Sequence, residues 1–120
     1  MNLIILLFTF LFISQLLADF SDTMDDATLV KINQARTGYI SSGGDVDFFT
    51  IKLFAGRTYT ITLKSLTPAP PAKVFDNHLT LYNPDRSYIT ENDDTHDKNA
   101  EITFTATVSG FYYIKTRAFY

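Results

Sequence analysis

The alternation of apolar and polar residues constrains the fold of this chain more than any other feature of its sequence. Residues 57–64 (RTYTITLK) alternate Tyr59, Ile61 and Leu63 with threonines. A period of two residues is typical of a strand that has one face in a core and the other in solvent. Residues 46–53 (VDFFTIKL) show a similar pattern, and no stretch of the chain keeps a helical period. We therefore expect strands rather than helices.

Further short strands follow, separated by residues that favour turns. The separating segments are residues 83–86 (NPDR), 92–99 and 109–110 (SG). Strands of this length and spacing predict an all-β fold, an antiparallel β-sandwich. The later strands are expected at residues 79–82, 88–91, 101–106 and 111–117.

The connections can be predicted as well. Ala55 and Gly56 lie between the first two strands, so we expect residues 46–53 and 57–64 to pair antiparallel as a hairpin. Residues 67–72 (TPAPPA) contain three prolines, which lack the amide donor that a strand ladder needs. We expect this segment to be a surface crossover loop.

The first eighteen residues differ from the rest of the chain. Residues 3–13 (LIILLFTFLFI) are apolar apart from Thr9, and an acidic segment begins at Asp19. The run is shorter than the ~20 residues of a membrane-spanning helix and is typical of a secretory signal peptide. Ala18 offers a small-residue cleavage site, so we expect residues 1–18 to be removed and residues 19–120 to form one domain. The alternative is an uncleaved membrane anchor, because no lysine or arginine precedes the apolar run.

Composition limits the function. Hydrophobic residues make up 46% of the chain, with 11 Phe and 7 Tyr, which is enough to form a core without a disulfide or a bound metal. The absence of cysteine excludes disulfides, thiolate zinc sites and cysteine catalysis. A net charge of −3 gives no electrostatic reason to bind nucleic acid. We expect a secreted or periplasmic protein with no membrane contact after cleavage.

The residue types of a hydrolytic site are present without the spacing of one. His78 and His96 lie in or beside loops, outside any metal or nucleophile motif. Ser41 and Ser42 precede two glycines, but a nucleophile elbow needs a strand followed by a helix. We expect no catalytic site, and hence no enzyme.

Carboxylates gather in two parts of the sequence. Asp22, Asp25 and Asp26 belong to an acidic lead-in, and Asp45 and Asp47 stand at the entry to a strand. Hard oxygen ligands in loops suit Ca²⁺, which takes ~6–8 oxygens in flexible geometry. The alternative is that these residues form turns and cap their own backbone.

Tyrosines are the candidates for a binding surface. Rigid aromatic rings give contact area at low entropy cost, and Tyr39, Tyr82, Tyr88 and Tyr112 are possible members of such a surface. The alternative is that these rings pack in the core and only their hydroxyl groups reach water.

Several of these segments, in their order along the chain, resemble the bacterial pre-peptidase C-terminal domain. The resemblance covers residues 19–115 and implies a jelly-roll-like β-sandwich, found as an accessory domain of secreted proteases and other extracellular enzymes. Collagen-binding domains of some secreted collagenases are similar and bind calcium through an acidic lead-in and strand-entry aspartates. The matching segments are residues 27–29 (ATL), 37–40 (TGYI), 44–49 (GDVDFF), 55–61 (AGRTYTI), 79–83 (LTLYN), 92–94 (NDD) and 109–114 (SGFYYI).

The chain departs from this family at its end. The family usually continues after a strand like residues 111–117 into a final strand, which is missing here, and it commonly has Trp or Tyr in place of Phe48. An open edge would invite a strand from a partner or a second copy. We therefore expect a secreted, non-catalytic module that binds an extracellular protein, a polysaccharide or an associated enzyme. The alternative is an interaction protein that assembles through the open edge.

Overall fold

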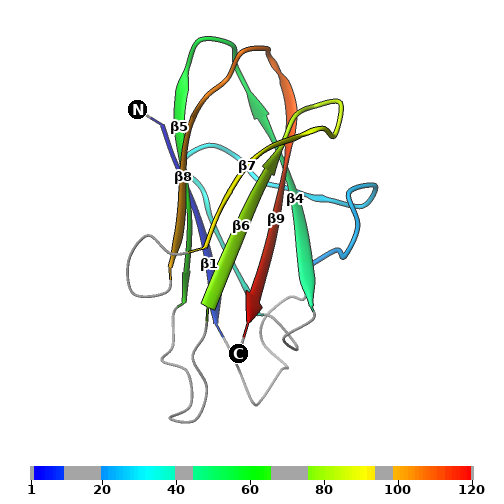
Figure 1. Ribbon diagram of the computed structural model, residues 1–120, viewed down its shortest axis with the longest axis vertical. Coiled ribbons are helices and arrows are strands. Elements are labelled where there is room, and N and C mark those ends of the chain that lie inside the picture. Colours follow the sequence, from blue (N-terminus) through cyan, green and yellow to red (C-terminus); the bar gives the residue numbers. More distant parts are fainter. Residues whose placement is uncertain (1, 10–19, 40–44, 66–75, 94–98, 120) are drawn as a thin grey trace.

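The computed structural model describes residues 2–9, 20–39, 45–65, 76–93 and 99–119, and in these ranges two sheets pack face to face (Figure 1). Sheet A has the strand order β3-β1-β5-β8, and sheet B has the order β2-β4-β9-β6-β7. No helix in the described ranges is long and apolar enough to span a membrane. The expected all-β sandwich is confirmed. The strands are β1 (Asn2–Thr9), β2 (Thr28–Leu29), β3 (Ala35–Tyr39), β4 (Val46–Leu53), β5 (Thr58–Ser65), β6 (Asp76–Tyr82), β7 (Tyr88–Asn92), β8 (Ala100–Thr105) and β9 (Gly110–Phe119).

The strands from β4 to β9 follow the path of a jelly roll. β4 pairs with β9, β5 with β8 and β6 with β7, all antiparallel, so the pairs nest like those of one long hairpin. The hairpin folds over on itself because β9 also pairs with β6. This fold places β4, β9, β6 and β7 in sheet B and β5 and β8 in sheet A, which is the two-sheet arrangement of a jelly roll.

The core lies between the sheets and follows the predicted alternation. Sheet A contributes residues such as Ile61 and Leu63, and sheet B contributes residues such as Phe49 and Ile114, all fully buried. Burial of apolar side chains from both inner faces is the main source of stability in a sandwich of this kind. The remaining core residues are Val30, Ile51, Leu53, Tyr59, Leu79, Leu81, Ala100, Ile102, Ala106 and Tyr112.

The predicted hairpin between residues 46–53 and 57–64 is wrong. β4 lies in sheet B and β5 in sheet A, so residues 54–57 carry the chain across one end of the sandwich. Gly56 adopts a φ of 82° there, a left-handed conformation that glycine adopts without a steric penalty. Its N–H donates to the carbonyl of Ala106 at 2.8 Å, which ties the corner to the end of β8. Alternation identifies the buried face of each strand, but it does not tell whether two such faces lie side by side or opposite one another.

Two sets of pairings depart from the antiparallel expectation. β2 runs parallel to β4, and β1 runs parallel to both β3 and β5. β1 comes from the apolar run that we expect to form the centre of a signal peptide, and here it is a strand of sheet A. The expected cleavage site at Ala18 lies outside the described residues.

The expected open edge beside the last strand does not exist. β9 has β4 on one side and β6 on the other, so it lies inside sheet B (Figure 1). The prediction was wrong because it assumed that the last strand in the sequence would also be last in the sheet. In the described part of the chain, the edges of sheet B are β2 and β7.

Candidate functional site

Three of the five predicted metal-ligating aspartates meet beside the start of β4. Carboxylate oxygens of Asp22, Asp45 and Asp47 all lie within 4.8 Å of one another. Asp22 is exposed, Asp45 is half-buried and Asp47 is fully buried. We call these three residues the acidic cluster.

The acidic cluster forms because the start of the lead-in, residues 20–27, is held against β4. The backbone N–H of Phe48 donates to the carbonyl of Ser21 at 2.8 Å. The ring of Phe20 packs edge-on against the buried ring of Phe49, with centroids 4.9 Å apart. These two contacts fix Phe20 and Ser21, the two residues directly before Asp22, and bring the Asp22 carboxylate to the strand entry.

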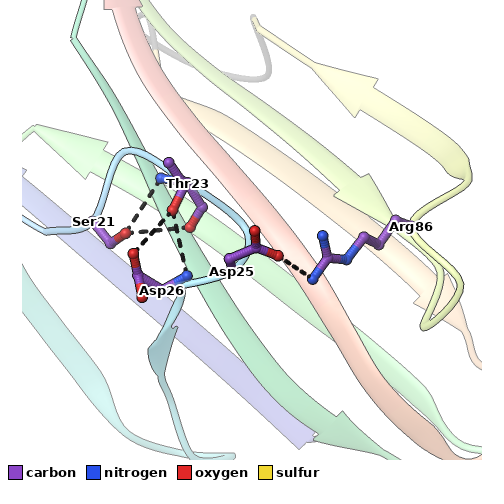
Figure 2. A network of polar contacts seen from close by, with 5 residues as sticks. All are labelled: Ser21, Thr23, Asp25, Asp26 and Arg86. Atoms are coloured by element: carbon purple, nitrogen blue, oxygen red, sulfur yellow. Dashed lines mark hydrogen bonds and ion pairs between the residues drawn. The ribbon is translucent and has the colours of Figure 1, made fainter.

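The other two predicted ligands, Asp25 and Asp26, have polar contacts of their own (Figure 2). Asp25 forms an ion pair with Arg86, with an Oδ1 to Nη2 distance of 2.7 Å. The backbone N–H of Asp26 donates to Thr23 Oγ1 at 3.4 Å, and that hydroxyl contacts the Asp26 carboxylate at 3.5 Å. Thr23 therefore caps this local turn, and the Asp26 carboxylate accepts from the capping hydroxyl. Neither Asp25 nor Asp26 belongs to the acidic cluster.

The acidic cluster has the chemistry of a site for a hard cation. Its donors are all carboxylate oxygens, which Ca²⁺ prefers and which can bind in monodentate or bidentate fashion. Like charges at such short separation repel one another, and a divalent cation between them would turn that repulsion into attraction. The three carboxylates would supply three to six of the ~6–8 oxygens that calcium takes, and backbone carbonyls or water would supply the others.

A second candidate is a row of tyrosines on the outer face of sheet B. Tyr113 on β9 lies directly opposite Tyr82 on β6, which in turn lies opposite Tyr88 on β7. The rings of Tyr82 and Tyr88 meet edge to face, with centroids 6.5 Å apart. Tyr82 and Tyr113 are half-buried, and Tyr88 is 57% exposed. We call these three residues the tyrosine row.

Cations lie over the rings of this face. Lys115 Nζ is 5.9 Å from the centroid of Tyr82, and the Arg86 guanidinium is 5.4 Å from the centroid of Tyr113. Hydrogen bonds first to Asp25 and then to Tyr113 raise the pKa of Arg86 above its ordinary value. The outer face of sheet B therefore combines flat rings with permanent positive charge, an arrangement of cation–π contacts.

The structure places two of the four predicted tyrosines on this face. Tyr82 and Tyr88 lie on the outer face, but Tyr112 is fully buried, and its hydroxyl donates to the carbonyl of Val108 at 2.8 Å. Tyr39 ends β3, and its side chain lies outside what the structure describes.

The prediction named Tyr112 instead of its neighbour Tyr113. Adjacent residues on a strand face opposite sides, and both sides of β9 carry aromatic rings, so alternation alone did not show which tyrosine faces outward. Lys115 and Arg117 share the face of Tyr113, and they are the signal in the sequence that identifies this face as the outer one.

An apolar hollow of about 350 Å³ opens near one end of the same sheet. The exposed ring of Phe111 forms part of its wall, and Lys52 Nζ lies 5.3 Å from the centroid of that ring. The hollow thus extends the combination of rings and cations beyond the tyrosine row. Its other lining residues are Leu29, Val30, Lys31, Ile32, Ile51 and Phe54.

His78 is buried and contacts neighbouring side chains of its own sheet. It is 7% exposed, its Nε2 lies 2.9 Å from Glu91 Oε2, and its Nδ1 lies 3.5 Å from the Thr80 hydroxyl. Thr80 is itself 2% exposed, so this hydroxyl is closed to a substrate. His96, Ser41 and Ser42 lie outside the described residues.

A comparison with protein-family models places most of this architecture in one family. The model of the bacterial pre-peptidase C-terminal domain matches residues 45–118, which is more than half of the chain. The matched range nearly coincides with the jelly roll from β4 to β9, and it contains the tyrosine row together with Asp45 and Asp47. Neither curated proteins nor solved structures gave a match. The chain belongs to the family of bacterial pre-peptidase C-terminal domains.

Proposed function

We propose that this chain is an exported accessory module that binds an extracellular polymer, either protein or polysaccharide, through the tyrosine row. The family consists of non-catalytic accessory domains, typically appended to secreted proteases. The signal-peptide profile of residues 1–18 supports export. Binding would then be the contribution of the module to whatever enzyme works beside it.

The observation that carries this proposal is the position of three tyrosines side by side on a solvent-facing sheet. Tyr113, Tyr82 and Tyr88 come from three adjacent strands, so the sheet itself fixes their spacing. Rings held by a sheet lose little entropy when a ligand packs on them, and tyrosine offers an apolar face together with a hydroxyl group. An extended polymer matches such a row better than a compact ligand does, because the row runs across the strands without enclosing a cavity.

We further propose that Ca²⁺ binds the acidic cluster and orders one border of this face. Asp22 in the cluster and Asp25 beside Arg86 are separated by two residues of the lead-in. Arg86 in turn covers the ring of Tyr113. Calcium that fixes Asp22 against β4 would therefore also hold Asp25 in place for Arg86, and so support the position of the cation on the binding face.

Co-sedimentation with insoluble polymers tests the binding role. The wild-type protein is mixed with cellulose, chitin and fibrillar collagen, and the bound fraction is compared with that of the double variant Tyr82→Ala, Tyr88→Ala. The matched control is Thr103→Ala, Thr105→Ala, which alters two exposed residues of sheet A. We expect the tyrosine variant to bind at least about tenfold more weakly and the control to bind like wild type, since truncation of an aromatic hot spot costs about 2 kcal/mol or more. Equal binding by all three proteins would exclude the tyrosine row.

A further inference from the structure

Strand β1 occupies an unusual place in the fold. It lies inside sheet A, where Ile5–Thr9 pair with β3 and Asn2–Phe8 pair with β5. In the described part of the chain, β3 is connected to the rest of sheet A through β1. Without β1, sheet A would consist of the two-stranded ladder β5-β8 and a separated β3.

The same segment has the sequence of a removable leader. β1 has the sequence NLIILLFT, without a charged side chain, and all of it except Asn2 lies within the apolar run that predicts a signal peptide. Export under the proposed function would remove a strand that the fold uses. A two-stranded ribbon is marginally stable alone, and the unpaired edges of β3 and β5 would be open to another strand.

Removal of residues 1–18 would leave the position of β1 between β3 and β5 empty, and we call this position the slot. We propose that the slot then accepts an extended apolar strand from a partner polypeptide. This proposal rests on the export that the proposed function includes. Main-chain hydrogen bonds to both walls would supply affinity, as in other cases where a peptide adds a strand to a sheet.

The slot defines the chemistry of its guest. On β5, Ile61 faces the core and is fully buried, while Thr60 and Thr62 face the other way and are still only 6% and 5% exposed. Both faces of β5 are therefore buried beside β1, although Glu101 and Thr103 on the outer face of β8 are exposed. β1 fills this position with eight residues and no charged side chain, so we infer a guest of about eight uncharged residues.

The orientation of the guest is restricted to two choices. β3 and β5 both run parallel to β1, so they are parallel to each other. A guest can therefore pair parallel with both walls, as β1 does, or antiparallel with both. Parallel pairing is slightly less stable per residue, so a partner strand running opposite to β1 would compete well with the leader itself.

The test compares two natural forms of the protein. The exported form is purified from the medium and its first residue is found by intact mass, and the unprocessed chain is made without export. Amide hydrogen exchange is then measured with and without the peptide KK-NLIILLFT-KK. The control peptide carries Ile5→Pro, because proline cannot donate to a ladder.

We expect the exported form, starting at Asp19, to exchange at least about tenfold faster than the unprocessed chain in residues 35–39 and 58–65. The leader peptide should restore protection there, and the proline peptide should not. Exchange in β6 and β9, which do not pair with β1, should be the same in both forms. Full protection of β3 and β5 in the exported form, with no response to the peptide, would mean that the slot closes by itself and would overturn the proposal.

Other outcomes separate this proposal from the proposed function. Exported protein that keeps Met1 and still binds a polymer would overturn the slot while leaving the binding role intact. Peptide uptake without any polymer binding would support the slot and contradict the binding role. If the exported form proves too unstable to purify, Ile5→Pro in the unprocessed chain should open the same slot, and unchanged exchange in that variant would overturn the proposal.

Discussion

Replacement of Asp45 by asparagine should have opposite effects on stability with and without calcium. In chelator, Asp45→Asn removes one of three negative charges that lie within 4.8 Å of one another, so the domain should become more stable. In calcium, the same change removes a charged ligand, so the domain should lose most of the stabilisation that the ion gives. A carboxylate that only caps a turn would give neither result.

The expected magnitude follows from the distances. Two unit charges 4.8 Å apart repel by about 3.5 kcal/mol at an effective dielectric constant of about 20. Asp22 is exposed, and exposed pairs contribute only about 0–1 kcal/mol. Asp45 is half-buried, so solvent also reduces its repulsion with Asp47 well below the first figure. We therefore expect Asp45→Asn to stabilise the calcium-free domain by about 1–2 kcal/mol, or roughly 4–16 °C in Tm. Calcium at 100 times its Kd should stabilise the wild type by about 2.7 kcal/mol, and the variant by much less.

Thermal unfolding is measured in chelator and in millimolar calcium, at equal ionic strength and with magnesium as a further comparison. The matched control is Asp26→Asn, which removes a carboxylate from the same lead-in but outside the acidic cluster. We expect the control to keep the full calcium shift. An Asp45→Asn protein that is less stable in chelator and still shifts with calcium would refute the reasoning.

Three further changes test the packing and the tyrosine row. Tyr112→Phe should cost about 1 kcal/mol in the free energy of unfolding, because it removes the hydroxyl bond to Val108 but keeps the buried ring, and a cost above about 3 kcal/mol would contradict this. Gly110→Ala should destabilise by about 1–3 kcal/mol in denaturant unfolding, because the new Cβ would lie 2.8 Å from Pro84 Cγ, and an unchanged midpoint would show that the turn moves freely. Desolvation and then the charge of Glu91 raise the pKa of Tyr88, so folding favours its protonated form. Any stability that the protonated form contributes should be lost as pH rises through that pKa. Ultraviolet titration of the wild type and of Tyr88→Phe measures the shift.

The sequence predicted the strands from β4 to β9, but not β1, β2 or β3, because burial imposes a period that local residues reveal. The alternation around Tyr59 and Ile61 gave both the strand and its core face, and the structure confirms both. The connection between β4 and β5 was not predictable in the same way. A hairpin and a crossing at the end of a sandwich bury the same alternate residues, and they are distinguished by long-range pairings, here of β4 with β9 and of β5 with β8.

The sites were predictable only as sets of candidates. Asp22, Asp45 and Asp47 converge because the start of the lead-in contacts β4, and these contacts join residues more than twenty positions apart. Asp25 carries the same side chain as Asp22, yet a long-range ion pair with Arg86 takes it away from the cluster.

The apolar run at the start of the chain is ambiguous for a related reason. A signal peptide and a strand covered on both faces both appear as a continuous apolar segment, and periodicity does not separate them. In the structure residues Asn2–Thr9 form β1, and the sequence of the same residues predicts a leader.

The two candidate sites are joined by the lead-in, so they should be coupled. Calcium at Asp22 would order the segment that presents Asp25 to Arg86, and Arg86 covers Tyr113 in the tyrosine row. Coupling between two ligands is reciprocal, so a polymer on the tyrosine row should also tighten calcium binding. The Asp25–Arg86 pair is exposed and transmits at most about 1 kcal/mol, so the change in either affinity should be no more than about fivefold. Asp25→Asn should abolish this coupling while leaving each site to bind alone, and calcium titrations with and without polymer would detect it; coupling that survives the substitution would have to pass through β4 instead.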